Sequence, residues 1–348
     1  MTNWPALADV IRNVSYLTDV EQVREQFDAF LLQSDPADAF AIAGIFSLAH
    51  PFYVPKMNDE VASSLAITMP EFGEAIMRAR LAASRARQPN VLVACFPKSA
   101  STFITNCLLS VLDVRGASLM ASSFSTQAPY SMGITLREQE TDELALLKHG
   151  SNGGGYVAQH HVRCTPYLCQ QLELYNIRPI ITYRNIEDSL VSLDDMYCRA
   201  RETDESWRDT YAMYFSDAMP HNYRQLDAET RFMLLVDRQL AWYVQFYMSW
   251  KRCEEMGLVK PCWVSYERDF LGDKRVLAER IANFIGPDFV DMEKLTDKLS
   301  ERKAVGESRF NKGVSGRGKG IPESVKRRIR QSLEPYRAEC DLSEILDG

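Results

Sequence analysis

The sequence predicts an α/β fold in which helices cover both faces of a central parallel sheet, giving three layers. Beyond residue 90, short apolar runs alternate with segments of helical periodicity, the pattern of strands joined by crossover helices. Polar or charged residues follow several of these apolar runs, at the strand ends where ligands of such sheets bind. We therefore expect a functional site at the carboxyl ends of the strands.

Residues 1–88 precede the alternating pattern and are predicted to be helical. Asp19 is a capping residue before an amphipathic pattern, and further helices are expected over 37–48 and 71–87. This part of the chain contains no motif that indicates chemistry. We expect it to form a helical N-terminal extension that packs on the core.

Residues 89–348 are expected to form the α/β domain. The aromatic-rich segment 197–235 within it is interpreted as a lid or a wall of a substrate pocket, and 115–140 reads as mostly loop. Strands are predicted over 91–95, 156–162, 179–184 and 262–266, and the clearest helices over 165–175 and 231–256.

Composition argues against several classes of protein. The apolar content of 46% and the charged content of 25% are those of an ordinary globular protein. A net charge of −7 argues against a nucleic-acid partner, and the apolar run 39–54 is too short and too interrupted to span a membrane. The eight cysteines include no Cys-x-x-Cys pair, so a zinc or dithiol site is not expected. Scattered free thiols favour a reducing, cytoplasmic location.

The residues after the 91–95 strand have the character of an anion-binding loop. They run Pro97, Lys98, Ser99, Ala100, Ser101 and Thr102, and apolar residues at helical spacing follow from Phe103. Backbone N–H groups at a helix N-terminus favour an anion, and a lysine with three hydroxyls adds further donors. The spacing of a Walker A loop is absent.

A second motif is Arg184 at the end of a buried strand, with Ser192 eight residues later. An unpaired buried charge is very costly, so Arg184 is expected either to bind a phosphate or to pair with Glu187 or Asp188.

A third motif, residues 309–320, alternates glycines with cations inside a basic stretch. Residues 301–330 contain ten Lys or Arg and three Asp or Glu. Glycines let the backbone approach an anion closely, although a disordered basic linker would have a similar composition.

Together the three motifs resemble those of the P-loop-like sulfotransferases of the cytosolic and bacterial type, which use 3′-phosphoadenosine 5′-phosphosulfate (PAPS). The family's first signature, Pro-Lys-Ser-Gly-(Ser/Thr)-Thr-(Trp/Phe), matches residues 97–103 with Ala100 in place of the glycine. Its strand-end Arg and the Ser eight positions later match Arg184 and Ser192. Its Arg-Lys-Gly-x-x-Gly matches residues 311–316 with Asn311 in place of the arginine. The resemblance covers residues 90–325.

The resemblance implies a P-loop-like sulfotransferase fold and a two-ended site for PAPS and its desulfated product PAP. By this resemblance the 5′-phosphosulfate would be surrounded by Lys98, Ser99, Ala100, Ser101 and Thr102. The 3′-phosphate would be surrounded by Arg184, Ser192, Asn311, Lys312 and Gly313, with Arg317 or Lys319 replacing the missing cation. The adenine would contact Phe103 and Tyr266.

The resemblance also implies a histidine base on the strand 156–162. The cytosolic branch of the family ends this strand in Lys-x-His, and this chain has Gln159-His160-His161. Strand alternation places Gln159 and His161 on one face and His160 on the other, so His161 matches the catalytic histidine, with His160 as the alternative. A near-neutral pKa suits a histidine to this role.

The predicted function is transfer of the sulfuryl group from PAPS to a hydroxyl of a small molecule, lipid or saccharide. Such in-line transfer depends on positioning, and Lys98 would stabilise the charge on the leaving group without a metal ion. The alternatives are a P-loop kinase, which needs Gly-Lys-Ser/Thr and usually a strand-end Asp, and a non-catalytic nucleotide-binding scaffold protein. The oligomeric state stays open, a homo-oligomer included.

Overall fold

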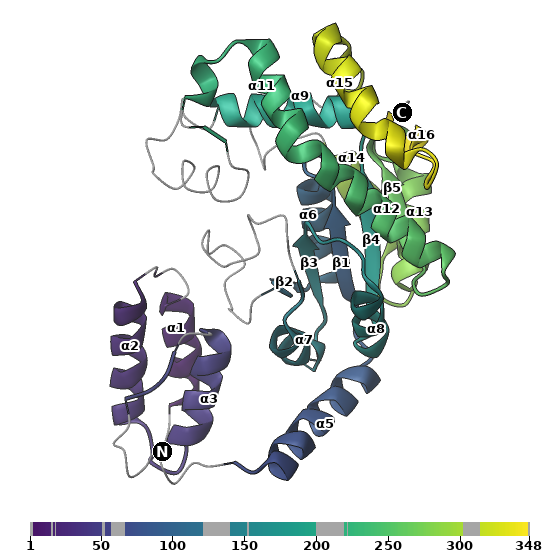
Figure 1. Ribbon diagram of the computed structural model, residues 1–348. Coiled ribbons are helices and arrows are strands. Elements are labelled where there is room, and N and C mark those ends of the chain that lie inside the picture. The colour runs from purple at the N-terminus through teal and green to yellow at the C-terminus, as the bar shows by residue number, and fades with distance from the viewer. Residues whose placement is uncertain are drawn as a thin grey trace.

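The protein is built on a five-stranded parallel sheet. The computed structural model describes residues 3–14, 17, 19–50, 53–56, 67–120, 140–151, 153–199, 219–220, 222–301 and 314–346 (Figure 1). The strand order is β2-β3-β1-β4-β5, which confirms the predicted α/β fold with a parallel sheet. The strands are β1 (Asn90–Cys95), β2 (Arg115–Ala117), β3 (Tyr156–His160), β4 (Ile177–Tyr183) and β5 (Cys262–Ser265).

The central strand β1 has side chains in both hydrophobic clusters of the sheet. Leu92 and Ala94 belong to one cluster, as does Phe96 directly after the strand, and Val91 and Val93 belong to the other. This alternation is the period of two that a doubly covered strand requires. The first cluster is covered by α7 (Glu143–Gly150), α8 (Pro166–Leu174) and α12 (Ala241–Glu255), and the second by α6 (Ser101–Leu112), α13 (Lys274–Ile285) and α14 (Met292–Ser300).

The connections on either side of β1 run along opposite faces of the sheet. The helix α6 leaves β1 on one face, whereas α8 joins β3 to β4 on the other. Right-handed crossovers in opposite directions produce this arrangement, and in sheets of this kind ligands bind at the carboxyl end of the strands where the direction reverses. The loop after β1 and the ends of β3 and β4 therefore meet at one edge.

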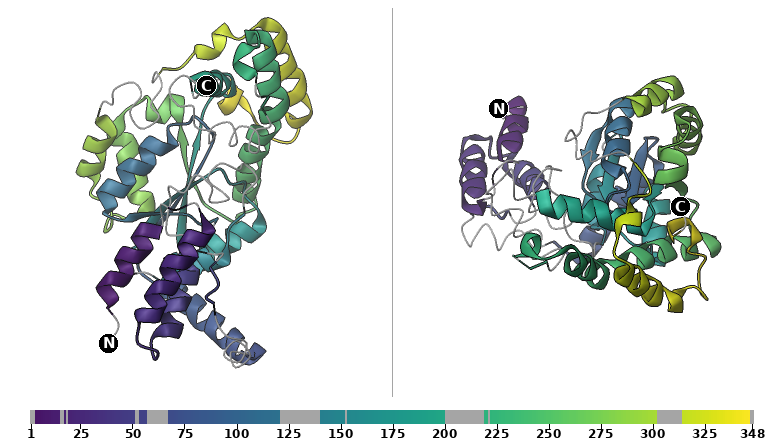
Figure 2. Two further views of the ribbon diagram at one scale, coloured as in Figure 1. Left: turned by 90° about the vertical axis from the view of Figure 1, so that its left-hand side faces the viewer. Right: turned by 90° about the horizontal axis from the view of Figure 1, so that it is seen from above.

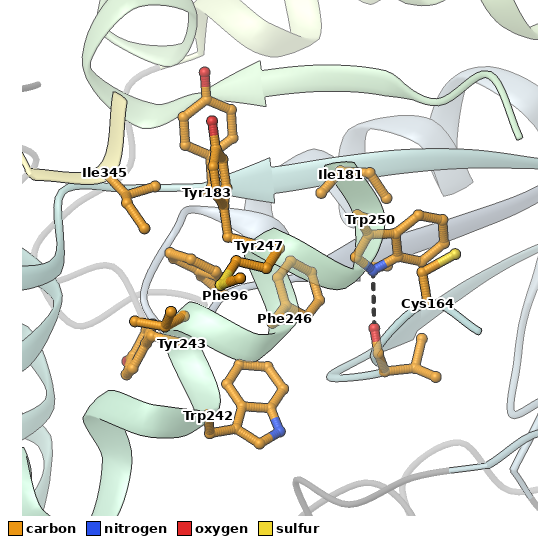
Figure 3. Packing of buried hydrophobic residues seen from close by; sticks show 14 of the residues in the cluster. Phe96, Cys164, Ile181, Tyr183, Trp242, Tyr243, Phe246, Tyr247, Trp250 and Ile345 are labelled. Atoms are coloured by element: carbon orange, nitrogen blue, oxygen red, sulfur yellow. Dashed lines mark hydrogen bonds between the residues drawn. The ribbon is translucent and has the colours of Figure 1, made fainter. Parts of the chain in front are cut away.

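Aromatic side chains of α12 fasten the first layer to the sheet (Figure 3). Phe96 meets the rings of Tyr243 and Phe246 with centroids 4.9 and 5.2 Å apart. The indole N–H of Trp250 donates to the carbonyl of Val162 at 3.0 Å, just beyond β3. The predicted helix 231–256 is present as three consecutive elements. It begins with α11 (Ala228–Leu235), continues through a π-helical turn, Val236–Leu240, and ends with α12.

The N-terminal helices have a hydrophobic cluster of their own. α1 (Trp4–Val14), α2 (Val20–Gln33) and α3 (Ala39–Ala49) enclose Phe27 and Phe46, whose rings stack 3.9 Å apart. They lie beside one another, away from the sheet (Figures 1 and 2). α5 (Met69–Arg85) starts at a Thr68 capping box and packs on α7 and α8.

Three further helices complete the described fold. These are α9 (Ile186–Arg199), α15 (Glu323–Leu333) and α16 (Ser343–Leu346). The short strand β2 lies in the stretch predicted to be mostly loop, because its three residues have no apolar run and become a strand only by pairing with β3. None of the described helices has the length and apolar content needed to cross a lipid bilayer.

Candidate functional site

The loop between β1 and α6 has two non-glycine residues in the left-handed region. Lys98 has φ 69° and Ala100 has φ 64°. Ala100 occupies the N-cap of α6, whose first turn contains no acidic residue. The first N–H groups of a helix have no partner within the helix, and the positive end of the helix dipole lies at the same place. Because no acidic side chain of the first turn of α6 opposes them, this position suits an anion.

Ser99 and Tyr243 hold this loop in place. The buried Ser99 hydroxyl lies 2.7 Å from the Phe96 carbonyl and 2.7 Å from the Thr182 hydroxyl of β4. The Tyr243 hydroxyl donates to the Pro97 carbonyl at 3.4 Å. Because its hydroxyl is already engaged, Ser99 supports the loop with its side chain and could contact a ligand only through its backbone.

The conformation of Ala100 gives the first testable prediction. A left-handed conformation costs an alanine about 1–2 kcal/mol and costs a glycine little, so Ala100→Gly should raise the free energy of unfolding by about 1 kcal/mol. Urea denaturation measures this value. The matched control is Ala94→Gly within β1, which should lower the free energy of unfolding. Destabilisation of similar size in both variants would contradict the role given to φ at Ala100.

Gln159 joins β3 to the loop hydroxyls. Its side-chain amide donates to Ser101 at 3.0 Å and to Thr102 at 3.4 Å. This glutamine stands where the resembled family has a lysine. It orients two hydroxyl groups of the loop without adding a charge.

His161 follows β3 on the same side as Gln159. Its Nδ1 lies 2.8 Å from the Cys95 carbonyl, and its ring meets Trp242 edge-on at 6.1 Å. A carbonyl can only accept, so Nδ1 carries the proton. In the neutral ring the lone pair is then at Nε2, the tautomer that a base acting through Nε2 requires.

His160 lies on the opposite face, as the alternation predicts. It is 3% exposed, and its Nε2 accepts the backbone N–H of Leu119 at 2.9 Å. Burial lowers its pKa to about 3, with His161 adding to the effect. His160 is therefore neutral and enclosed, which favours His161 over His160 as the proposed base.

The buried histidines also predict how stability depends on pH. Burial lowers the pKa of His149 to about 4 and that of His160 to about 3, against 6.5 in an unfolded chain. Below pH 6.5 the unfolded chain binds protons that the folded chain does not, so stability is fully present above 6.5 and falls as the pH drops. Each histidine should contribute about 1.4 kcal/mol per pH unit in this window. The free energy of unfolding, measured by urea denaturation between pH 7 and pH 5, should depend less steeply on pH in His160→Gln than in the wild type. An unchanged dependence on pH would contradict the assignment.

Arg184, immediately after β4, contacts both other motifs. Its guanidinium donates to the Lys98 carbonyl at 3.3 Å and to the Val314 carbonyl at 2.8 Å. It also pairs with Asp188 at 3.4 Å and Glu267 at 3.7 Å. The carboxylate pairing expected as one alternative is thus present, although through Asp188 and Glu267 and not Glu187. Burial raises the pKa of Glu267, while the Asn185 N–H and Arg184 oppose the shift.

Asp188 fixes the glycine-rich segment against α9. Its carboxylate accepts the backbone N–H of Gly316 at 2.8 Å and that of Gly318 at 2.7 Å. A Cβ on Gly318 would lie 2.4 Å from the Cβ of Glu187, so only glycine fits there. This docking role of Asp188 was missed from the sequence, where Asp188 was considered only as a possible partner of Arg184.

One of the two sequence-predicted aromatic residues, Tyr266, lies beside Arg184. The guanidinium carbon lies 4.0 Å from the centroid of the Tyr266 ring, at the start of a π-helical turn, Tyr266–Phe270. Phe270 stacks on Tyr266 at 5.2 Å and meets Phe103 edge-on at 5.5 Å. Phe103 and Tyr266 are therefore brought to one aromatic group beside the loop.

Some predicted residues are not brought to the site or lie outside the described residues. Asn311, Lys312 and Gly313 lie outside them, as do residues 121–139 of the predicted loop stretch and residues 200–218 of the predicted lid or substrate wall. Ser192 is buried on α9. Arg317, expected to replace the missing cation at Asn311, pairs with Asp195 of α9 at 2.5 Å, and Lys319 is exposed.

The fold and these contacts define a parallel α/β protein with a loop suited to an anion at the carboxyl edge of its sheet. No family model matches the sequence, and no curated protein is similar to it. Among solved structures, the mouse sulfotransferase SULT7A1 complexed with PAP is similar to this chain. The two share 16% identity with a TM-score of 0.42, over 77% of this chain and 90% of the mouse chain.

Proposed function

We propose that this protein is a sulfotransferase that transfers the sulfuryl group of PAPS to a hydroxyl of a small molecule, lipid or saccharide. The observation that carries the proposal is the position of Arg184, which donates to Lys98 on one side and to Val314 on the other. Three motifs far apart in the sequence thus meet at one side chain. A nucleotide with a phosphate at each end would need this convergence.

The residues at the loop end fit a 5′-phosphosulfate. Lys98 supplies positive charge, the start of α6 supplies N–H groups, and Gln159 orients the hydroxyls of Ser101 and Thr102. At the other end, the buried Nε of Arg184 lies 3.7 Å from a carboxylate oxygen of Glu267 but makes no hydrogen bond within the described residues, and it would gain one from a phosphate oxygen. Lys312 and Gly313, directly before Val314, would complete that end.

When bound, PAPS would supply an activated sulfuryl group. His161, held by the Cys95 carbonyl through Nδ1–H, would accept the proton of the attacking hydroxyl at Nε2. Lys98 would offset the negative charge that grows on the oxygen of the departing nucleotide. The acceptor would be positioned by residues near Trp242, which contacts the His161 ring.

The kinase alternative is disfavoured by the strands next to β1. In a P-loop kinase an aspartate commonly ends a strand beside the phosphate loop, where it organises magnesium. Here β3 ends at His160 and β4 at Tyr183, followed by Arg184. Neither neighbour of β1 supplies the carboxylate.

Nucleotide binding provides the direct test. Calorimetry on the full chain should show PAP binding more tightly than 5′-AMP, which lacks the 3′-phosphate, and more tightly than adenosine 2′,5′-bisphosphate, which carries it at the wrong position. Tighter binding of ATP with magnesium than of PAP would contradict the proposal. Labelled PAPS with a panel of hydroxyl acceptors then separates the enzyme from a scaffold, because a scaffold binds PAP and transfers nothing.

A further inference from the structure

Three buried cysteines, two at the start of α8 or just before it and one in α12, have their sulfur atoms close together. Cys164 precedes α8, Cys169 lies in its second turn, and Cys253 lies near the end of α12. Their sulfur atoms all lie within 4.8 Å of one another, and those of Cys164 and Cys169 are 3.4 Å apart. Each residue is at most 5% exposed. All eight cysteines are described, and none forms a disulfide.

We propose that Cys164, Cys169 and Cys253 bind one Cu(I) ion. Sulfurs that each bind one metal ion at about 2.3 Å are about 4 Å apart, close to the spacing found here. Thiolates select soft ions such as Cu(I) and Zn(II). Zinc in closed protein sites takes four donors, whereas this group contains three sulfurs and, among the described residues, no carboxylate or imidazole. Three sulfurs match a three-coordinate Cu(I) thiolate site.

A cavity lies beside the cluster. It has a volume of ≈ 450 Å³, and its lining includes Cys164 together with Met248 and Ser249 of α12. The Ser249 hydroxyl accepts the backbone N–H of Cys164 at 3.0 Å, which fixes the residue that opens to the cavity. Cu(I) would enter there, and each thiol that becomes a ligand would release its proton to solvent by the same path.

The thiols of Cys164 and Cys169 are protonated when no ion is present. Burial raises the pKa of Cys169 to about 11, and burial and the neighbouring thiols raise that of Cys164 well above its ordinary value. Neutral thiols in a dry site react slowly with oxidants and electrophiles. A cation that displaces their protons would change the cluster from passive packing into a bridge between α8 and α12. This inference does not depend on the proposed transferase activity.

Competition with a coloured Cu(I) chelator under anaerobic conditions tests the site in the reduced full-length chain. One Cu(I) per chain should bind, with X-ray absorption showing three sulfur neighbours. Cys164→Ser, Cys169→Ser and Cys253→Ser should each weaken binding about 100-fold or more. The matched control is Cys262→Ser, equally buried but in the cluster on the other face of the sheet, which should keep the affinity.

Thermal unfolding gives a second readout, and its main comparison, the wild type with and without Cu(I), requires no binding-site variant. Cu(I) should raise the midpoint of the wild type and of Cys262→Ser, and should leave Cys253→Ala unchanged. Unchanged Cu(I) affinity in the cluster variants, an equal loss in Cys262→Ser, or tighter binding of Zn(II) than of Cu(I) would overturn the proposal. Absence of Cu(I) binding by the reduced wild-type chain would overturn it as well.

Discussion

His161→Ala is expected to lower kcat for sulfuryl transfer by about 10²–10⁴-fold, the range that a positioned general base contributes. The affinity for PAP should change little, because the described contacts of the histidine ring are with the end of β1 and with Trp242. Steady-state kinetics with the most active acceptor of the panel measures the first quantity, and calorimetry with PAP the second.

The neighbouring His160 supplies the control for this experiment. His160→Gln should lower stability and leave kcat of the folded enzyme nearly unchanged, because the ring is buried and hydrogen-bonded to the Leu119 backbone. Loss of transfer in His160→Gln with full activity in His161→Ala would mean that the assignment of the base is wrong.

Lys98→Ala should lower kcat by about 10²–10³-fold, comparable with the loss of one preorganised donor in other enzymes. Its effect on the affinity for PAP should be much smaller, since the charge that Lys98 offsets develops fully only as the sulfuryl group leaves. Alanine keeps a Cβ at a residue with φ 69°, so the backbone strain of the loop is the same in both proteins. The quantities to compare are the fold-change in kcat and the fold-change in the Kd for PAP.

Two controls sharpen the Lys98 experiment. Lys98→Met removes the charge but retains most of the aliphatic chain, and it should behave like Lys98→Ala. Lys294→Met, on the exposed face of α14, should leave kcat unchanged. Equal activity of Lys98→Met and wild type would remove the lysine from the mechanism.

Arg184 shows why a strand-end cation cannot be assigned from sequence alone. Its position after a buried apolar run predicts that it must find an anion, and phosphate and carboxylate satisfy that requirement equally well. In the folded chain the carboxylates of Asp188 and Glu267 already offset its charge, and two backbone carbonyls accept hydrogen bonds from its N–H groups. Arg184 thus supports the architecture of the proposed site as well as offering a contact for a phosphate.

The three clustered cysteines show a different case, a group that no sequence motif indicates. The spacing of Cys164 and Cys169 does not match a Cys-x-x-Cys pair, and Cys253 lies in a separate helix far along the chain. The sequence therefore gave no reason to expect a metal site. Packing of α8 against α12 brings the three sulfurs together, and no local pattern records that contact.

Local patterns determined the alternation of strands and helices, the anion-suited loop after β1, and the shared face of Gln159 and His161. These features depend on side-chain periods of two and 3.6, which operate over a few residues and can be read directly. The tertiary structure alone decided the strand order, the docking of Gly316 and Gly318 on Asp188, and the meeting of Lys98, Arg184 and Val314. Those contacts join segments 86 to 130 residues apart, and their geometry follows from how whole layers pack.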